Sequence, residues 1–390
     1  MPIRYLEIQP QIKEYGKQSL LAWQTREQQL ALAIQTLKQS SKDVNVLPDC
    51  IRSVLATGGR NLRFALPTHE PMDSVFSARV GQDSFTVLAV DGSQIEPDPH
   101  AAILFALINI GIFHLAPGSG SAPQETIQSI LLDFNEVNDS DHVLDEDFLS
   151  LKRDLMERQA LVKAAAQTSG LVVALTDGPL ELYHEPQQDQ KMKEPFNLYL
   201  NSLRDLANQG VIVAGYVDKP RADLVTRMLE LVLLQDIAQA GQERPLRGIT
   251  DADLFSSLLA PQQRSALFGM HSSSSRYYQE ELELHFFYLN VGREGHAWIA
   301  RVEVPAWVAK DNDQISQLQQ VLLEQSHIMG SKPYPYALHR AHEIALVTFE
   351  EKERLEMQLL RELQTAGLPL RTQSHKSSAK LLSRRKRNPR

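Results

Sequence analysis

The spacing of apolar positions divides the chain into a helical beginning, a middle in which strands and helices alternate, and a helical end. Between Ser19 and Leu37, apolar residues recur every three or four positions, which predicts an amphipathic helix. A second short helix is expected to include Ile51 and Leu55, and Leu66–Pro71 is expected to be a linker or loop.

Two near-continuous apolar runs in the middle of the chain predict strands that are buried on both faces, as in the centre of an α/β sheet. The first is Phe85–Val90, followed by Asp91-Gly92-Ser93, and the second is Leu171–Leu175, followed by Thr176-Asp177-Gly178. Helical spacing between them predicts a helix at Phe148–Gln167.

The remaining pattern completes an alternation typical of an α/β fold. Strands are expected within Ala102–Leu115 and at Thr126–Asp133, Val211–Tyr216, Glu281–Leu289 and Trp298–Val304, and helices at Phe196–Asn208, Leu224–Gln239 and Tyr336–Thr365. Strict alternation in Glu281–Leu289 predicts a strand that is buried on one face, paired with Trp298–Val304.

Composition narrows the class of protein. Of the 390 residues, 43% are hydrophobic and 23% charged, as is ordinary for a globular protein. The single cysteine, Cys50, excludes an intrachain disulfide and a multi-cysteine zinc site. Met1–Lys17 lacks the apolar stretch of a signal peptide, and the most apolar run, Ala101–Ala116, is shorter than a membrane span. We therefore expect a cytoplasmic protein with no membrane segment.

Charge is distributed unevenly along the chain. The formal net charge is −8, yet Arg371–Arg390 holds eight Lys or Arg residues and no acid. A basic tail on an acidic body suits a polyanionic partner such as DNA, although a solvated, disordered tail without a specific partner explains the pattern equally well.

Asp91 and Asp177 each come directly after a predicted buried strand and directly before a glycine. Ligands of α/β sheets bind beyond the carboxyl ends of the strands, and the glycine lets a phosphate or metal approach the backbone. Taken singly, an Asp-Gly after a strand is also a common turn signal. The occurrence of two favours a functional site.

Glu157 lies on the buried side of the helix that precedes the Asp177 strand, although an ion pair with Arg153 four residues earlier is an alternative. Asp91, Glu157 and Asp177 together would offer oxygen ligands, which suit Mg²⁺ or Mn²⁺. Such a site polarises a phosphate and activates water, often with two metal ions.

Two other residues are candidates for the same chemistry. His342 shares a helix face with Leu338 and Leu346, which predicts that it points inward, as a metal ligand, a proton-transfer group or a hydrogen-bonded core histidine. Lys219 follows a strand and could contact a phosphate, or be a solvated surface lysine. The chain has no P-loop, dinucleotide-binding, Gly-x-Ser-x-Gly or His-Glu-x-x-His motif, so the corresponding activities are not expected.

The ordered set of these motifs resembles the NurA family of nucleases. The resemblance covers residues 85–345 and rests on the following segments: Ala89-Val90-Asp91-Gly92-Ser93, Glu157, Thr176-Asp177-Gly178-Pro179-Leu180, Gly215–Lys219, and Tyr334-Pro335 followed by Ala341-His342. It implies an RNase H-like mixed sheet flanked by helices, and a Mn²⁺- or Mg²⁺-dependent nuclease with 5′-to-3′ exonuclease and single-strand endonuclease activity.

The same resemblance implies roles and partners. Asp91, Asp177 and Glu157 would be metal ligands, and His342 a ligand or proton-transfer group. Tyr334 would lie at the edge of the site, while Lys219 and Ser93 would contact substrate. The protein would be a homodimer that acts on DNA with a hexameric HerA-type ATPase, in end resection and double-strand break repair. Asp154 and Glu146 compete with Glu157 for its role, and Asp251 and Glu303 are left without one.

We expect three regions: a helical N-terminal region (1–70) for dimerisation or partner contact, a nuclease domain (71–368), and a basic, disordered tail (369–390). Two other functions remain open. One is a catalytically weak adaptor that clamps DNA or an ATPase ring, and clustered acids count against it. The other is an actin-like sugar or acetate kinase, and the lack of recognisable adenosine and phosphate motifs counts against that.

Overall fold

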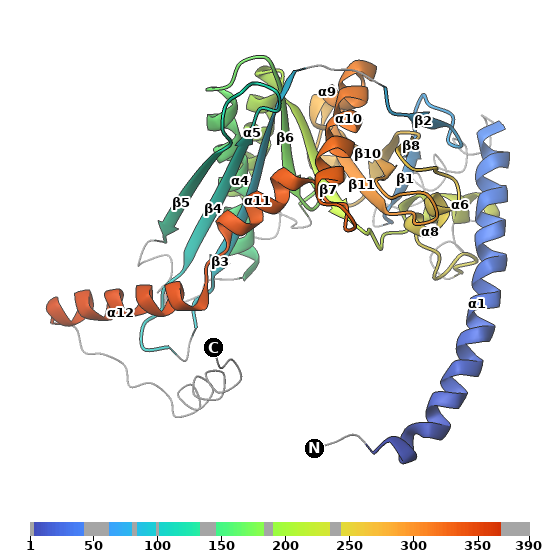
Figure 1. Cartoon of the computed structure of the whole chain (residues 1–390), viewed down its shortest axis with the longest axis horizontal. Coiled ribbons are helices and arrows are strands. Elements are labelled where there is room, and N and C mark those ends of the chain that lie inside the picture. Colours follow the sequence, from blue (N-terminus) through green and yellow to red (C-terminus); the bar gives the residue numbers. More distant parts are fainter. Residues whose placement is uncertain are drawn as a thin grey trace. The chain divides into compact units, whose positions relative to one another are not determined.

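The structure is a computed structural model that describes residues 4–42, 62–79, 84–98, 101–132, 146–182, 190–234 and 243–367 (Figure 1). The expected helix around Ile51–Leu55 and the basic tail lie outside these residues. The chain divides into two compact units. Unit 1 comprises residues 1–82, 178–181 and 214–335, and unit 2 comprises residues 83–177, 182–213 and 336–390.

Unit 2 is built on a mixed sheet. Its strands are β3 (Phe85–Ile95), β4 (Leu107–Leu115), β5 (Gln124–Leu131) and β6 (Leu171–Asp177), in the spatial order β6-β3-β4-β5. β4 runs antiparallel to β3 and β5, whereas β6 runs parallel to β3. β7 (Ile212–Asp218) is the next neighbour of β6, and its first two residues belong to this unit. On one side of β3, the strands β4 and β5 continue the sheet as an antiparallel meander, and on its other side β6 is parallel to it. This is the order expected for an RNase H-like core.

Helices cover both faces of this sheet. They are α4 (Glu146–Ala165), α5 (Gln190–Asn208), which packs on α4, and α11 (Tyr336–Ala345), whereas α12 (Phe349–Thr365) follows α11 and has no buried residue among those described. A Cβ atom built on Gly92 would meet Arg153 and Glu157 of α4, and one built on Gly111 would meet the backbone of α11. Gly111 is the cross-strand partner of Asp91, so Gly111 and Gly92 face opposite sides of the sheet. α4 and α11 therefore pack on opposite faces (Figure 1).

Unit 1 contains the N-terminal helix and a second group of strands. The elements are α1 (Tyr5–Lys42), β1 (Phe64–Pro67), β2 (Val75–Ser77), α6 (Leu224–Leu234), α8 (Asp251–Ser256), β8 (Gln263–Ser265), β9 (Phe268–His271), the 3₁₀ turns η2 (Ser275–Tyr277) and η3 (Glu280–Leu282), β10 (Leu284–Asn290), β11 (Ile299–Pro305), α9 (Ala306–Ala309) and α10 (Asn312–Ile328). The strands lie in the order β1-β9-β10-β11-β7, and β8 pairs with β2 and β10.

Buried acids in unit 1 have structural partners. Asp251 accepts hydrogen bonds from the backbone amides of Val225 and Thr226 at the start of α6 and from the Tyr288 hydroxyl. Glu303 pairs with Arg301 at 2.8 Å and accepts from the Leu180 amide at 2.9 Å. These contacts stabilise helix and loop backbone, so neither acid needs a ligand to explain its burial.

Most predicted elements are confirmed, but several boundaries were wrong. β3 continues past Asp91 to Ile95 because β4 stays paired with it. Leu66 and Pro67, expected in a loop, belong to β1, which pairs with β9. The single helix expected over Tyr336–Thr365 is two helices, because Thr348 caps a new one through a capping box with Glu351. β10 is buried on both faces except at His285. α10 was not expected.

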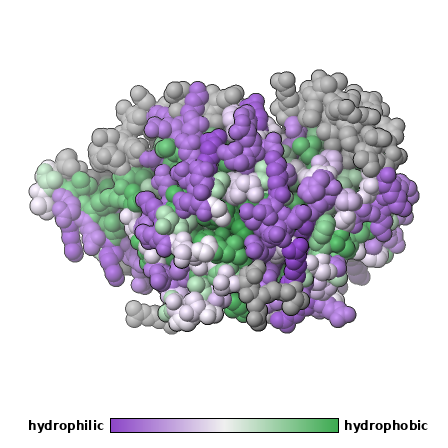
Figure 2. Space-filling view, turned by 90° about the horizontal axis from the view of Figure 1, so that it is seen from above, coloured by the Kyte–Doolittle hydropathy of each residue, from purple (hydrophilic) through white to green (hydrophobic). Residues whose placement is uncertain are grey.

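No helix among the described residues is long and apolar enough to cross a bilayer. The large apolar side chains that are exposed belong to several elements, among them Trp23 on α1, Ile127 on β5 and Met357 on α12. Figure 2 accordingly shows hydrophilic and hydrophobic residues intermixed on the face that it presents.

Candidate metal centre

Asp91 and His342 meet on the α11 face of the unit 2 sheet. His342 Nδ1 lies 2.7 Å from Asp91 Oδ2, a hydrogen bond between a strand and a helix that are 251 residues apart in sequence. The Asp91 side chain is 18% exposed and that of His342 is 61% exposed. The prediction that His342 points into the core was therefore wrong, because the side chain lies on the surface and still contacts Asp91. With the Asp91 carboxylate as the acceptor, this bond requires an imidazole proton on Nδ1.

Asp177 ends the strand beside Asp91. β3 and β6 are parallel, and their register runs from Phe85 opposite Leu171 to Val90 opposite Thr176. One further step along this register brings Asp91 and Asp177 to neighbouring positions on one face, and neighbouring strands are about 4.8 Å apart. Asp177 is exposed. The two aspartates thus share an end and a face of the sheet, as expected from their positions after the two buried runs.

Glu157 lies against the opposite face. Its Oε1 would be 2.7 Å from a Cβ atom on Gly92, whose side of β3 is the side of α4. The carboxylate is flanked by Arg153 Nε at 3.6 Å and Arg158 Nη1 at 3.7 Å. Glu157 is 6% exposed, so its predicted burial is confirmed, and the alternative of a pair with Arg153 is also present.

The environment of Glu157 disfavours its charged form. The pKa of Glu157 is raised to about 8, mainly by burial, with the carboxylates of Asp154 and Asp91 adding to the shift and Arg158 and Arg153 opposing it. Asp154, the competing candidate, pairs with Arg153 at 3.0 Å. A cation near Glu157 would hold it ionised, whereas without one it tends to keep its proton.

Two residues that sequence reasoning did not single out bring His342 to Asp91. A Cβ on Gly111 would lie 2.6 Å from the Ala341 oxygen and the Ala345 nitrogen, so only glycine lets α11 approach β4 this closely. Asn109, buried on the same face two residues earlier, donates to the Ala345 oxygen at 2.8 Å. The signal was visible in the sequence, because a polar residue and a glycine occur in the mostly apolar run Ala101–Ala116 at positions that share one strand face.

The other predicted site residues have the following surroundings. Ser93 Oγ donates to the Ala345 oxygen at 2.5 Å. Lys219 and Tyr334 belong to unit 1, where Lys219 Nζ lies 3.6 Å from the centre of the Trp298 ring and Tyr334 meets Tyr216 edge to face at 5.6 Å between ring centres. Lys219 also has a positive φ of 43°, a sparsely populated backbone conformation for a residue other than glycine.

Within the described ranges, no group of three or more His, Cys, Asp or Glu side chains is arranged to hold a metal ion. The structure nevertheless brings Asp91 and His342 into contact and places Asp177 at the neighbouring strand end. Carboxylate oxygens with one imidazole nitrogen fit Mn²⁺ or Mg²⁺ chemically. Glu157 completes such a set only if its side chain leaves the α4 face.

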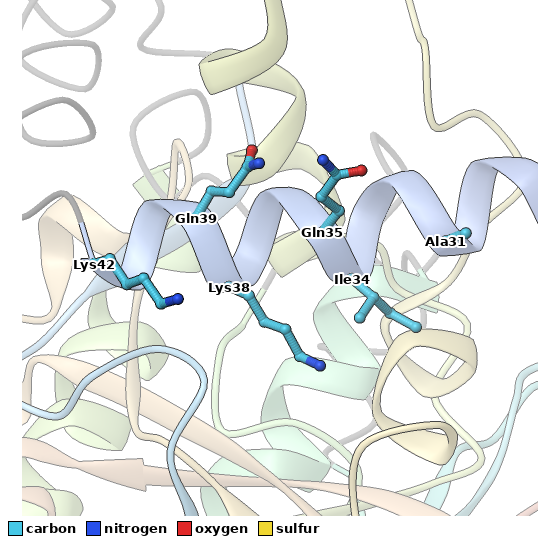
Figure 3. A pocket seen from close by; sticks show the side chains of 6 residues that line it. All are labelled: Ala31, Ile34, Gln35, Lys38, Gln39 and Lys42. Atoms are coloured by element: carbon cyan, nitrogen blue, oxygen red, sulfur yellow. The ribbon is translucent and has the colours of Figure 1, made fainter.

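An open groove of about 680 Å³ extends from this site. One wall is the continuation of β3 from Ser93 to Asp98, and the other is the segment Leu346–Phe349 with Lys352. Leu346 and Phe349 are 55% and 46% exposed, so the groove has an apolar side next to the candidate residues. A second pocket lies on α1 and is lined by Ala31, Ile34, Gln35, Lys38, Gln39 and Lys42, none of which is a candidate site residue (Figure 3).

Several solved structures and one family model match this chain. Among solved structures, the NurA nuclease from Sulfolobus solfataricus matches with a TM-score of 0.50 and 13% identity over 84% of this chain and 98% of that one. A second NurA structure matches with a TM-score of 0.37 and 12% identity, over 87% of this chain and 97% of the other. Endonuclease V from Ciona intestinalis matches with a TM-score of 0.34 and 11% identity, over 70% of this chain and 87% of the other. No curated protein matches the sequence.

The first of these matches supports the mixed α/β fold with its RNase H-like core, a long C-terminal helix and a helical N-terminus. The model of the NurA domain matches residues 85–347, a range that begins with β3 and ends directly after α11. It therefore contains Asp91, Glu157, Asp177 and His342. The match covers well over half of the 390 residues, and the chain belongs to the NurA family.

Proposed function

We propose that this protein is a DNA nuclease that hydrolyses phosphodiester bonds with Mn²⁺ or Mg²⁺. The observation that carries the proposal is the meeting of Asp91 and His342 on one sheet face, with Asp177 at the neighbouring strand end. When bound, the metal would supply Lewis acidity toward the phosphate and an activated water. Asp91, Asp177 and His342 would hold it.

Each residue of the chain has a part in this proposal. Asp91 orients the His342 imidazole through Nδ1, which leaves Nε2 as the nitrogen that can ligate or move a proton. Glu157 keeps its proposed role as a third carboxylate ligand, through a side-chain movement from the α4 face. Ser93, Lys219 and Tyr334 are proposed to contact DNA directly or to support the residues that do.

The family resemblance supports the finer parts of the proposal. They are 5′-to-3′ exonuclease and single-strand endonuclease activity, a homodimer, a hexameric HerA-type ATPase as partner, and a role in DNA end resection and double-strand break repair in the cytoplasm. The basic tail, residues 369–390, is proposed to strengthen binding to a polyanion or partner.

The direct test is degradation of linear DNA by the purified protein with Mn²⁺, with Mg²⁺ and with chelator, for the wild type and for Asp91→Ala. We expect cleavage with metal and its loss in the variant. Asp313→Ala is the matched control, because Asp313 also pairs with a basic residue, Arg79, but is 77% exposed in unit 1. Absence of cleavage by the wild type with any divalent metal would favour the adaptor function.

Mn²⁺ should also stabilise the folded protein, because a ligand that binds only the native state raises the melting temperature by mass action. At a metal concentration a hundredfold above Kd, the gain is about 2.7 kcal/mol. We expect the rise in melting temperature to shrink in Asp177→Ala, whose side chain is exposed and therefore costs little stability when removed. An equal rise in both proteins would contradict the assignment of Asp177 as a ligand.

A further inference from the structure

A row of three polar side chains crosses the unit 2 sheet beneath the end of α11. Ser93 on β3 lies opposite Asn109 on β4, and Asn109 lies opposite Ser129 on β5. Ser93 Oγ and Asn109 Nδ2 both donate to the Ala345 oxygen, at 2.5 and 2.8 Å, and Ser129 Oγ donates to Asn109 Oδ1 at 2.6 Å. Two members of the row therefore donate hydrogen bonds to one backbone carbonyl in the last turn of the helix.

This carbonyl is free to accept both hydrogen bonds, because carbonyls in the last turn of a helix lack partners within the helix. Ala345 is the last residue of α11, and its oxygen receives two side-chain donors from two different strands. Asn109 is 6% exposed, so the hydrogen bonds are shielded from water. The Ser129 hydroxyl fixes which end of the Asn109 amide faces the helix.

The neighbouring row on the same face fixes how closely the helix sits. Asp91 lies opposite Gly111, over which the Ala341 and Ala345 backbone passes. His342 is three residues before Ala345, about 4.5 Å along the helix axis. The hydrogen bonds to the Ala345 carbonyl fix the position of α11 along its axis. The missing side chain of Gly111 sets the distance between α11 and the sheet. These two constraints bring His342 Nδ1 to 2.7 Å from Asp91.

We propose that Asn109 is a positioning residue that sets His342 against Asp91 by anchoring the C-terminal end of α11. Its effect on catalysis rests on the nuclease function proposed above, but its effect on geometry does not. Asn109 is the central member of the row, since it contacts the helix and is itself oriented by Ser129, whereas Ser93 makes one of the two bonds to the carbonyl.

The test is a double-mutant cycle with Asn109→Ala, His342→Ala and the combined variant, measured as kcat and KM on linear DNA with Mn²⁺. We expect Asn109→Ala to lower kcat by roughly ten- to a hundredfold, since small misplacements at a site cost this much, with KM changed less than about twofold. In the His342→Ala background the same substitution should have almost no further effect. An equal loss in both backgrounds would overturn the proposal.

Gln319→Ala is the matched control. Gln319 is also a buried amide that donates to backbone carbonyls, those of Phe76 and Gln262, but it lies in unit 1. It should lower the melting temperature while leaving kcat near the wild-type value. Ser129→Ala, which removes only the bond to Asn109 Oδ1, should change kcat in the same direction as Asn109→Ala but less. If Asn109→Ala does not fold, Ser129→Ala takes its place in the double-mutant cycle with His342→Ala.

A crystal structure of metal-free Asn109→Ala tests the geometry without any activity. We expect the His342 Nδ1 to Asp91 Oδ2 distance to exceed hydrogen-bonding range, about 3.2 Å. An unchanged contact in the folded variant would refute the positioning role. If the wild type cleaves no DNA with any metal, the proposed function fails, and this measurement still decides whether Asn109 positions His342.

Discussion

The two faces of the sheet around β3 place their acidic side chains in different environments. On the α11 face, Asp91 is partly open to solvent, touches His342 and lies beside the end of β6. On the α4 face, Glu157 is buried between Arg153 and Arg158, and its pKa is raised to about 8 by burial first of all. One face presents partly exposed candidate ligands, whereas the other holds a buried acid whose charge depends on its neighbours.

This difference separates two requirements of a metal site. A metal ligand has to be accessible, which the open face provides. Acids that lie close together repel one another, and on the other face the buried guanidinium groups of Arg153 and Arg158 supply positive charge that offsets this repulsion. Arg158 also donates to Thr176, the residue before Asp177, and so connects the buried face to the end of β6.

The sharpest way to break the comparison is to neutralise one acid on each face. We expect Asp91→Asn to reduce the rate of DNA cleavage at least about a thousandfold, equivalent to ~4 kcal/mol of activation free energy. Glu157→Gln, on the face away from His342, should reduce it by only about tenfold, or ~1.4 kcal/mol. Single-turnover rates with saturating Mn²⁺ measure both. Equal losses would mean that Glu157 reaches the metal as fully as Asp91 does.

Stability as a function of pH, compared between the wild type and Glu157→Gln, probes the buried face. The folded-state pKa of Glu157, about 8, lies above the ordinary value of 4.5, so the folded protein binds more protons between these values. The contribution is fully present below pH 4.5 and is lost as the pH rises toward 8. It amounts to on the order of a few kcal/mol, at about 1.4 kcal/mol per pKa unit.

Urea unfolding of metal-free protein between pH 5 and pH 8 measures this loss, and Glu157→Gln should flatten the profile. Asp154→Asn is the control on the same helix, and it should lower the pKa of Glu157 because the Asp154 carboxylate is one of the groups that raise it. A wild-type profile that matches Glu157→Gln would show that Glu157 is already ionised at low pH.

A substitution at Gly111 tests the close packing of α11 on the open face of the sheet. Gly111→Ala puts a methyl group 2.6 Å from two backbone atoms of α11, so the helix has to move. We expect a loss of about 1–3 kcal/mol in unfolding free energy, typical of overpacking, together with loss of cleavage activity. Gly118→Ala, in open space on the β4–β5 turn, has a positive φ of 73° and should cost stability without this loss of activity. Full activity in Gly111→Ala would contradict the close packing.

The smallest expected effect concerns the groove. Phe349 lines it beside Leu346 and is 46% exposed, and exposed aromatic rings stack nucleic-acid bases. Phe349→Ala should raise KM for single-stranded DNA by roughly three- to tenfold, about 1 kcal/mol, with kcat unchanged. Met357→Ala on the solvent side of α12 serves as the control. A change in kcat instead of KM would place Phe349 among the residues that shape the reacting centre.

The sequence predicted the order of strands and helices and the position of Asp91 and Asp177 at the ends of buried strands, because buried runs and strand-end acids leave clear local patterns. Only the family resemblance suggested that His342 would join them. The sequence did not predict the face on which Glu157 lies. That face is set by the side of the sheet on which α4 packs, against Gly92 and away from Asp91, and this packing is a long-range feature that the local sequence pattern does not contain. Nor did it predict Asn109 as an anchor, since an isolated buried polar residue shows its partner only after folding.

The break between α11 and α12 has a mechanical consequence. A single rigid rod from Tyr336 to Thr365 would act as a lever, so that any force on its far end would tilt His342. Thr348 begins a new helix with its own cap, and α12 has no buried residue among those described. A displacement of α12 can therefore be taken up between the two helices without tilting α11. The position of the imidazole is therefore not fixed by the direction of α12.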